Sequence, residues 1–151
     1  TNNKDLNANA QMIKEVMKTG KAYEKFKEMV EAQGGDIAYV EDPELLEKSK
    51  YIMPVLATES GTVEAIDADM VGSIAVYLGA GRMKDTGKIN RTAGITINKK
   101  IGDNVTVGET LAYIHTDDDS KVNNTTQNLK EAFKITNKKI NTNSRVLEIV
   151  K

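Results

Sequence analysis

The fold of this chain is decided by the stretch Gly102-Asp103-Asn104-Val105-Thr106-Val107-Gly108-Glu109-Thr110-Leu111-Ala112-Tyr113-Ile114-His115. It contains two turn pairs, Gly102-Asp103 and Gly108-Glu109, in which glycine allows the backbone angles of a tight turn. The β-branched and aliphatic residues around these turns predict short strands at residues 105–107 and 111–115. We therefore expect a small domain of short strands in this half of the chain.

The residues before this stretch predict three more strands and a helix. The expected strands are residues 51–57, 61–66 and 93–97. Apolar residues at intervals of three and four predict a helix over residues 68–78. Asp67 is its expected N-cap, and Gly79 or Gly81 is expected beyond its end.

After His115, the pattern predicts a charged helix over about residues 120–140 and a last strand over residues 145–150. No internal repeat of solenoid length is present. The order of these elements mixes helices and strands without a regular β-α-β alternation. The sequence thus predicts an α+β fold.

The first third of the chain has helical spacing instead. The apolar positions that carry it are Leu6, Ile13, Val16, Met17, Phe26, Met29 and Val30. Two helices separated near Thr19-Gly20 fit this pattern best, with Thr19 capping the second helix and Gly34-Gly35 ending it. Such an apolar stripe needs a partner surface.

Pro43 marks the change between the two regions, because it discourages helix at the preceding residue. A short helical turn is expected around Leu45-Leu46. We place the boundary here, with a helical segment at residues 1–50 and a β-rich domain at residues 51–151.

Composition narrows the class of protein. The 151 residues are 39% hydrophobic, which is enough for one ordinary core or two small ones. With 21 basic and 22 acidic side chains, the net charge of -1 gives no strong field toward nucleic acid or an anionic membrane. The chain has no cysteine, which is compatible with a reducing cytosol. No apolar run approaches a membrane span, and we expect the start at Thr1 to be a truncation.

The second half resembles a barrel-sandwich arrangement, and its Gly-Asp-x-Val-x-x-Gly-x-x-Leu turn pattern is similar to that of lipoyl and biotinyl carrier domains. A carrier domain presents one lysine at the hairpin tip after this strand. Here the tip is Thr116-Asp117-Asp118-Asp119, and Lys121 is the first lysine after it. Met83-Lys84 imitates half of a biotin attachment motif but precedes the barrel strands. We therefore expect solvated surface lysines instead of a carrier site.

A denser resemblance, over nearly the whole chain, is to pyrimidine-nucleoside phosphorylases. The segments that carry it are residues 20–26, 29–36, 40–43, 60–63, 78–82, 94–95 and 102–115, in the order and at the spacing of that family. Leu78-Gly79-Ala80-Gly81-Arg82 and Gly35-Asp36 look more like the broad-specificity enzymes than their thymidine-specific relatives. Asn90 is a departure, because the family usually has an acidic residue there.

This resemblance implies a small barrel-sandwich, or hammerhead-like, C-terminal domain of an enzyme that splits a pyrimidine nucleoside with inorganic phosphate. The family's glycine-rich phosphate loop and its Ser-Gly-Arg base-binding segment are absent. We therefore carry over no catalytic, cofactor-binding or metal residue. The implied role is rigid support of the phosphate-binding lobe, with the rest of the parent enzyme as partner, phosphate as its co-substrate and the cytoplasm as its location.

Other readings remain open at this point: the C-terminal domain of a thymidine or nucleotide phosphorylase, a stand-alone binding module, or a carrier domain. Base preference, sugar preference and oligomeric state do not follow from the sequence.

Four further features have a structural reading that we prefer. His115, the only histidine, is expected to be structural or at the surface, since a single histidine without cysteine makes no typical zinc site. Asp117-Asp118-Asp119 lacks the ligand spacing of a calcium loop and is expected to be a capped helix start. Arg82 is expected to bridge helix carbonyls or a carboxylate. Three dispersed tyrosines are expected in core or rim packing: Tyr51, Tyr77 and Tyr113.

Overall fold

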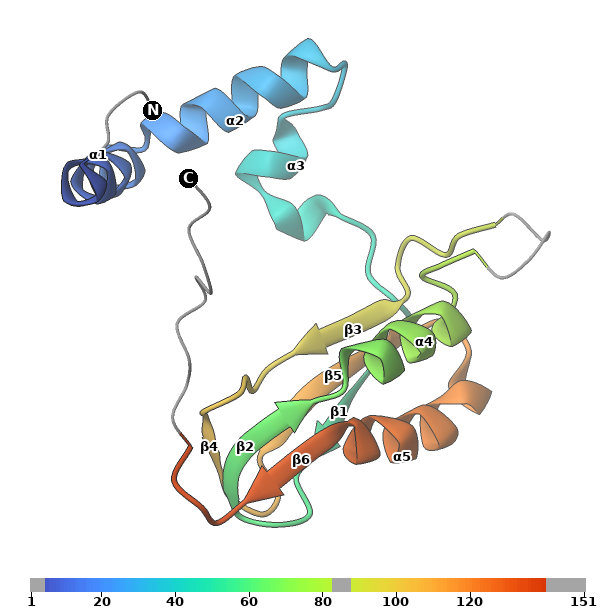
Figure 1. Ribbon diagram of the computed structural model, residues 1–151. Helices are drawn as coiled ribbons and strands as arrows, with labels where there is room; N and C mark the ends of the chain where they lie inside the picture. The colour runs from blue at the N-terminus through green and yellow to red at the C-terminus, as the bar shows by residue number, and fades with distance from the viewer. Residues whose placement is uncertain (1–4, 83–87, 141–151) are drawn as a thin grey trace. The chain divides into compact units, whose positions relative to one another are not determined.

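A computed structural model describes residues 5–82 and 88–140 of the chain. The chain divides into two compact units between Glu47 and Lys48, and each unit is described here by itself. We call the part before this division unit 1 and the part after it unit 2 (Figure 1).

The regular elements of unit 1 between residues 5 and 47 are all helical. They are α1 (Leu6–Lys18), α2 (Lys21–Ala32), α3 (Ala38–Glu41) and the 3-10 turn η1 (Pro43–Leu45). The expected pair of long helices is confirmed, but the cap between them is not as expected. The Thr19 hydroxyl donates backward to the Glu15 carbonyl at 2.8 Å, which ends α1. Gly20, with φ of 75°, is the N-cap of α2 because the sharp reversal needs a left-handed residue.

The contacts within unit 1 are polar and exposed. The Tyr23 hydroxyl donates to the Val40 carbonyl at 3.1 Å and so connects α2 to α3. Lys27 Nζ lies 3.2 Å from a carboxylate oxygen of both Glu24 and Glu41. Among its described residues, unit 1 buries no side chain of its own. The expected apolar stripe of α1 and α2 is therefore uncovered within the unit.

The described residues of unit 2 form two three-stranded antiparallel sheets, in the orders β1-β5-β3 and β4-β2-β6. The strands are β1 (Tyr51–Leu56), β2 (Gly61–Ile66), β3 (Gly94–Ile97), β4 (Asn104–Val105), β5 (Thr110–Thr116) and β6 (Phe133–Thr136). The helices are α4 (Ala68–Leu78), the 3-10 turn η2 (Asp119–Lys121) and α5 (Val122–Ala132). The α+β class is confirmed, and the two sheets do not close into one hydrogen-bonded barrel among the described residues.

The two predicted turns each contain a glycine with positive φ and a carboxylate that accepts a backbone hydrogen bond. Gly102 and Gly108 have φ of 93° and 85°. Asp103 accepts a bond from the Lys100 N–H at 2.7 Å, and Glu109 accepts one from the Thr106 N–H at 2.6 Å. The strand expected at residues 105–107 is shorter than predicted, because Thr106 and Val107 already belong to the turn that Glu109 closes.

The prediction of one helix over residues 120–140 is wrong in its second half. It ends at Ala132, and Phe133–Thr136 form strand β6 against β2. Phe133 and Ile135 turn into the core, whereas Lys134 points outward and pairs with Glu64 at 2.8 Å. The alternation over these residues belongs to a strand, and pairing with β2 overrides their helical context. The strand expected at residues 145–150 lies outside the described residues.

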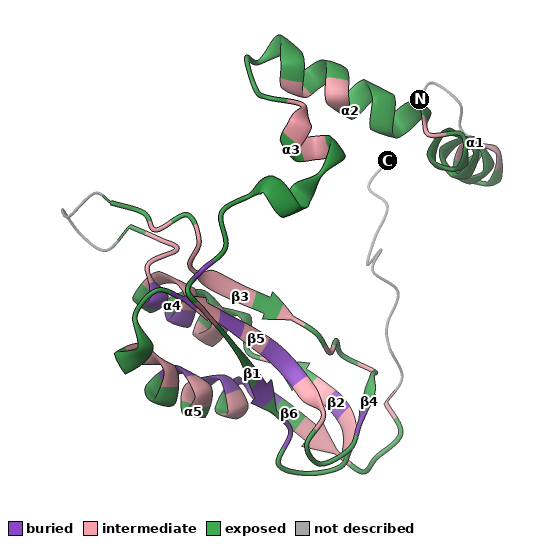
Figure 2. Ribbon diagram, turned by 180° about the vertical axis from the view of Figure 1, so that it is seen from behind, coloured by how far each residue is buried: buried purple, intermediate pink, exposed green. Residues whose placement is uncertain are grey.

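The core of unit 2 has two parts (Figure 2). One lies between the two sheets, around Val63, Leu111 and Phe133. The other lies between sheet β1-β5-β3 and the helices α4 and α5, around Ile114 and Leu129. Strand β5 contributes to both parts, which explains why the stretch 102–115 decides the fold. Among the described residues, no helix has the length and hydrophobicity that a membrane span requires.

Candidate functional site

The end of β5 holds three distant segments together through Asp117. Its Oδ1 accepts the Lys50 N–H at 2.8 Å, and its Oδ2 accepts the Asn90 side-chain amide at 2.8 Å. The Thr92 hydroxyl lies 2.8 Å from both Asp117 Oδ2 and Asn90 Oδ1, and its one hydrogen can serve either. We call these four residues the Asp117 cluster.

The cluster stabilises the ionised form of its carboxylate. The Lys50 backbone N–H, followed by the side chains of Asn90 and Thr92, lowers the pKa of Asp117. Asn90 suits this position because its amide donates to Asp117, whereas an acidic side chain would place a second carboxylate beside it. Its backbone N–H also donates to the Gly79 carbonyl at 2.9 Å, just past α4. The cluster thus joins the start of β1, the end of β5 and the segment that follows α4.

The neighbouring acidic residues have a different role. Asp118 Oδ1 accepts bonds from the Ser120 hydroxyl at 2.6 Å and the Ser120 N–H at 3.1 Å, as the N-cap of η2. The Ser120 hydroxyl is the main cause of the lowered pKa of Asp118. The capped helix start expected here is confirmed. Within residues 5–82 and 88–140, no group of three or more His, Asp or Glu side chains is placed to hold a metal ion.

His115 is half-buried on the face of β5 that the helices do not cover. Its Nε2 lies 2.9 Å from the Thr96 hydroxyl of the neighbouring strand β3, and the tautomer decides which of the two donates. This cross-strand bond gives His115 the structural role that was expected.

Arg82 and the lysines do not converge on a site. Arg82 is exposed, and its side chain makes no hydrogen bond or ion pair with the residues that the structure describes, so the expected bridge is not found there. Lys121 Nζ donates to the Tyr77 carbonyl at 3.0 Å and lies over the Tyr77 ring at 5.3 Å. It therefore stabilises the negative end of α4. Lys84, the other lysine weighed as a carrier site, lies outside the described residues.

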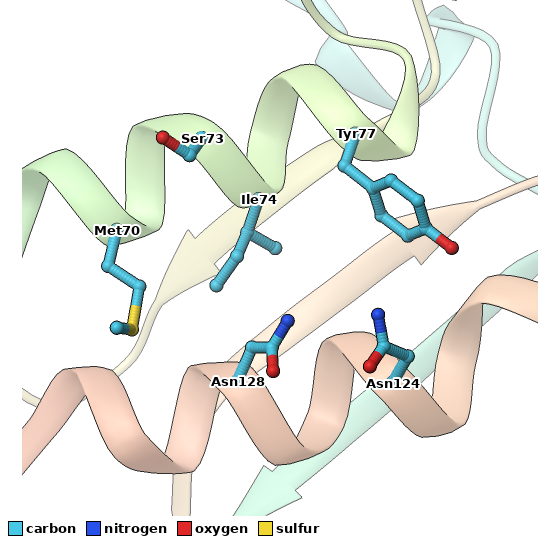
Figure 3. A pocket seen from close by; sticks show the side chains of 6 residues that line it. All are labelled: Met70, Ser73, Ile74, Tyr77, Asn124 and Asn128. Carbon is cyan, nitrogen blue, oxygen red and sulfur yellow. The ribbon is translucent and has the colours of Figure 1, made fainter.

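A groove of about 370 Å³ separates α4 from α5 (Figure 3). Its lining residues are Met70, Ser73, Ile74, Tyr77, Asn124 and Asn128. None of these side chains is cationic, so the groove offers no charge to hold a phosphate. Its lining combines apolar side chains with the side-chain amides of Asn124 and Asn128. It does not supply the groups that phosphorolysis needs.

The dispersed tyrosines likewise form no base-stacking platform. Tyr51 lies under the Lys50 ammonium at 5.0 Å, Tyr77 faces the groove, and Tyr113 lies on β5. Sequence reasoning missed the Asp117 cluster, whose members are separated by up to 67 residues. The sequence did offer one signal for this cluster: Asn90 stands where the family that the chain resembles usually has an acidic residue.

Comparison with known proteins identifies the family. Residues 62–136, about half of the chain, match the family described as pyrimidine nucleoside phosphorylase C-terminal domain. The chain is 40% identical over 124 residues to a pyrimidine-nucleoside phosphorylase of Geobacillus stearothermophilus, covering 82% of the chain and 28% of that enzyme. It is 45% identical over 103 residues to the enzyme of the same name in Bacillus subtilis, covering 68% of the chain and 24% of the enzyme.

A third relative, the pyrimidine-nucleoside phosphorylase of Staphylococcus haemolyticus, is 38% identical over 125 residues, which cover 83% of the chain and 29% of the enzyme. The chain thus spans roughly a quarter of the length of the curated relatives it matches. The matched range runs from β2 to β6 and includes both sheets apart from β1. Through these residues the chain belongs to the pyrimidine-nucleoside phosphorylase family, of which it carries the C-terminal domain.

Proposed function

We propose that this chain is the C-terminal part of a pyrimidine-nucleoside phosphorylase, an enzyme that uses inorganic phosphate to release the base from a pyrimidine nucleoside. The single observation that carries the proposal is the match of residues 62–136 to the C-terminal domain of that family, together with 38–45% identity to enzymes of that name.

In this proposal the chain supports the active site and does not form it. The described polar groups are engaged in holding the domain together: the Asp117 cluster, the cap at Asp118 and the bond between His115 and Thr96. The reacting groups, the phosphate site and the base site then lie in the preceding part of the parent enzyme. We further propose that unit 2 is the barrel-sandwich domain that the resemblance implies, which its two antiparallel sheets support.

Unit 1 fits the same assignment. Its uncovered apolar side chains, such as Ile13 and Phe26, need a covering surface to be stable in water. We assign residues 1–50 to the end of the parent α/β domain and its linker, so that the parent supplies this surface. We place the enzyme in the cytoplasm, with which the absence of cysteine from these 151 residues is compatible.

A chimera tests the assignment. In the Geobacillus stearothermophilus relative, the aligned residues are replaced by those of this chain, and phosphate-dependent release of uracil from uridine is measured. We expect an active chimera, and no activity for the same enzyme with the aligned segment deleted. The isolated chain is the third arm. Turnover by the chain alone at rates normal for enzymes would contradict the supporting role, and an inactive but folded chimera would contradict the family assignment of function.

A further inference from the structure

The groove between α4 and α5 has two sides of different chemistry. From α4, Met70 and Ile74 contribute apolar side chains, and Tyr77 contributes an aromatic ring. From α5, Asn124 and Asn128 contribute two amides that lie one helical turn apart, because residues four positions apart share a helix face. Figure 3 shows the amides extending from α5 toward α4, and Met70 and Tyr77 extending from α4 toward α5. The groove therefore has one largely apolar side and one side that carries amides.

The polar groups of the groove are not used by the fold. Among the residues that the structure describes, the two groove amides and the hydroxyls of Ser73 and Tyr77 make no hydrogen bond. On the same helix α5, by contrast, the Gln127 amide donates to the Glu131 carboxylate at 3.0 Å. The groove thus offers hydrogen-bond donors and acceptors to a ligand without breaking a bond between these described residues.

The groove is formed before any ligand binds. Ile74 and Leu129 belong to one core cluster, so the packing of α4 and α5 on the sheet sets the distance between the two helices. The Tyr77 residue is held as well, because Lys121 Nζ donates to its carbonyl at 3.0 Å and lies 5.3 Å from the centre of its ring. A ligand therefore meets side chains that need little ordering.

The size and charge of the groove restrict the class of ligand. Its volume of about 370 Å³ lies in the range of small-molecule pockets, about 300–1,000 Å³. All six lining side chains are uncharged, so inorganic phosphate or a sugar phosphate would find no opposite charge among them. Of the reactants and products in the proposed reaction, two are uncharged: the pyrimidine nucleoside and the free base. These two fit the groove electrostatically.

The chemistry of a pyrimidine ring complements both sides of the groove. One edge of the uracil ring carries carbonyl and N–H groups side by side, and a side-chain amide pairs with such an edge through its own N–H and C=O. Rotation of the amide exchanges these two groups, so Asn124 and Asn128 can each adapt to the ligand. The flat faces of the ring are suited to contact with Met70 and Ile74.

We propose that the groove between α4 and α5 is a binding site for an uncharged pyrimidine, taken up as the free base or as the nucleoside. The choice of a pyrimidine rests on the proposed function, to which the inference adds a ligand site within this chain. The amides of Asn124 and Asn128 bind the edge of the ring. The ligand contacts both helices, so its binding stabilises the folded state of unit 2.

Titration of the isotope-labelled chain, followed by NMR, tests the site directly. The three ligands are uracil, uridine and inorganic phosphate. We expect saturable shifts of the side-chain amide signals of Asn124 and Asn128 with uracil, with uridine or with both, and none with phosphate. Uracil alone identifies the base as the ligand, and uridine alone identifies the nucleoside. No shift of these signals with either pyrimidine, or equal shifts with phosphate, overturns the proposal.

A matched pair of asparagine substitutions gives an independent test. Asn128→Leu removes one groove amide, whereas Asn123→Leu removes an exposed amide of the same helix that does not line the groove. We expect Asn128→Leu to weaken pyrimidine binding by at least about tenfold, through a lost hydrogen bond and an unpaired ligand group. Asn123→Leu should leave the affinity unchanged. Equal affinities of the two variants would contradict the site, and the titration of the parent chain decides the case in which Asn128→Leu does not fold.

The activity of the chimera separates this inference from the proposed function. An active chimera, together with a chain that binds neither uracil nor uridine, overturns the groove site and leaves the proposed function intact. An inactive but folded chimera, together with a chain that binds a pyrimidine at Asn124 and Asn128, supports the groove site and contradicts the proposed function.

Discussion

Unit 1 and unit 2 contain helices of similar length, but only the helices of unit 2 place side chains in a core. Helices α4 and α5 place Ile74, Leu78 and Leu129 in a core against a sheet. Helices α1 and α2 leave Ile13, Met17 and Phe26 exposed. The comparison shows that an amphipathic pattern predicts a helix and an apolar face, whereas the surface that covers the face comes from elsewhere in the fold.

We expect the largest difference in unfolding free energy between substitutions of one isoleucine in each unit. Ile114→Ala removes a fully buried side chain from unit 2, and we expect it to cost about 2–5 kcal/mol of unfolding free energy through lost burial and a cavity. Ile13→Ala in α1, where Ile13 is 59% exposed, should change the free energy by about 0.5 kcal/mol or less. Urea unfolding of the intact chain, followed by circular dichroism, measures both. Equal costs would show that unit 1 has a core of its own.

Two glycines of unit 2 differ in the space that an added Cβ would have. A Cβ on Gly61 would lie 2.6 Å from the Thr136 carbonyl oxygen and 2.8 Å from Ile135 Cγ2, so Gly61→Ala must push β2 away from β6. We expect a loss of about 1–3 kcal/mol. Gly72→Ala is the control, since a Cβ there meets nothing within 4 Å and α4 should gain about 0.5–1 kcal/mol. Thermal unfolding should rank Gly72→Ala above the parent chain and Gly61→Ala below it.

The N-caps allow the same comparison between helices. Asp67 accepts the Met70 N–H at 2.9 Å at the start of α4, and Asp5 accepts the Asn7 N–H at 2.9 Å at the start of α1. Asp67→Ala should lower the unfolding free energy of unit 2 by about 0.5–2 kcal/mol, because α4 is part of its core. Asp5→Ala should reduce helical ellipticity without moving the unfolding midpoint of unit 2. A shift of that midpoint by both variants would mean that α1 and unit 2 unfold together.

The smallest effects concern pH, and they have opposite signs in the two units. Hydrogen bonds lower the pKa of Asp117, chiefly that from the Lys50 N–H, so its contribution to unit 2 is present at neutral pH. The contribution is lost as the pH falls from the ordinary carboxyl range of about 4 through the lower folded pKa. We expect the difference in thermal midpoint between the parent chain and Asp117→Asn to shrink between pH 7 and pH 3. A difference that stays constant with pH would contradict the role of the ionised carboxylate.

In unit 1, the Glu24 and Glu41 carboxylates raise the pKa of Lys27, with the hydrogen bond to Glu24 as the larger cause. The contribution of the ammonium is therefore complete at neutral pH and is lost as the pH rises through the raised pKa, above about 10.5. Lys27→Met should remove this alkaline dependence from the helical signal of unit 1. We expect only a small change, because the pair is exposed. An unchanged alkaline dependence in Lys27→Met would contradict this assignment.

Several features of this chain follow from local chemistry, and the sequence determines them by itself. The cap at Asp67, the left-handed Gly34, Gly79, Gly102 and Gly108, and the change from helices to strands after Pro43 depend on neighbouring residues only. The resemblance in residues 102–115 and in the other spaced motifs also identified the family, because a domain that keeps its turns keeps their residues. The α+β class follows from the same local signals.

The tertiary structure decided what depends on distant partners. Phe133–Thr136 form a strand because β2 offers an open edge and a core, whereas their neighbours in sequence favour the preceding helix. Lys50, Asn90 and Asp117 meet only when β1, β5 and the segment after α4 come together, so the contact does not follow from the residues near each of them in sequence. Burial along β5 has the same cause: alternation separates the two faces of a strand, but the packing of the helices and of the second sheet decides which side chains are buried, and consecutive Leu111 and Ala112 are both buried.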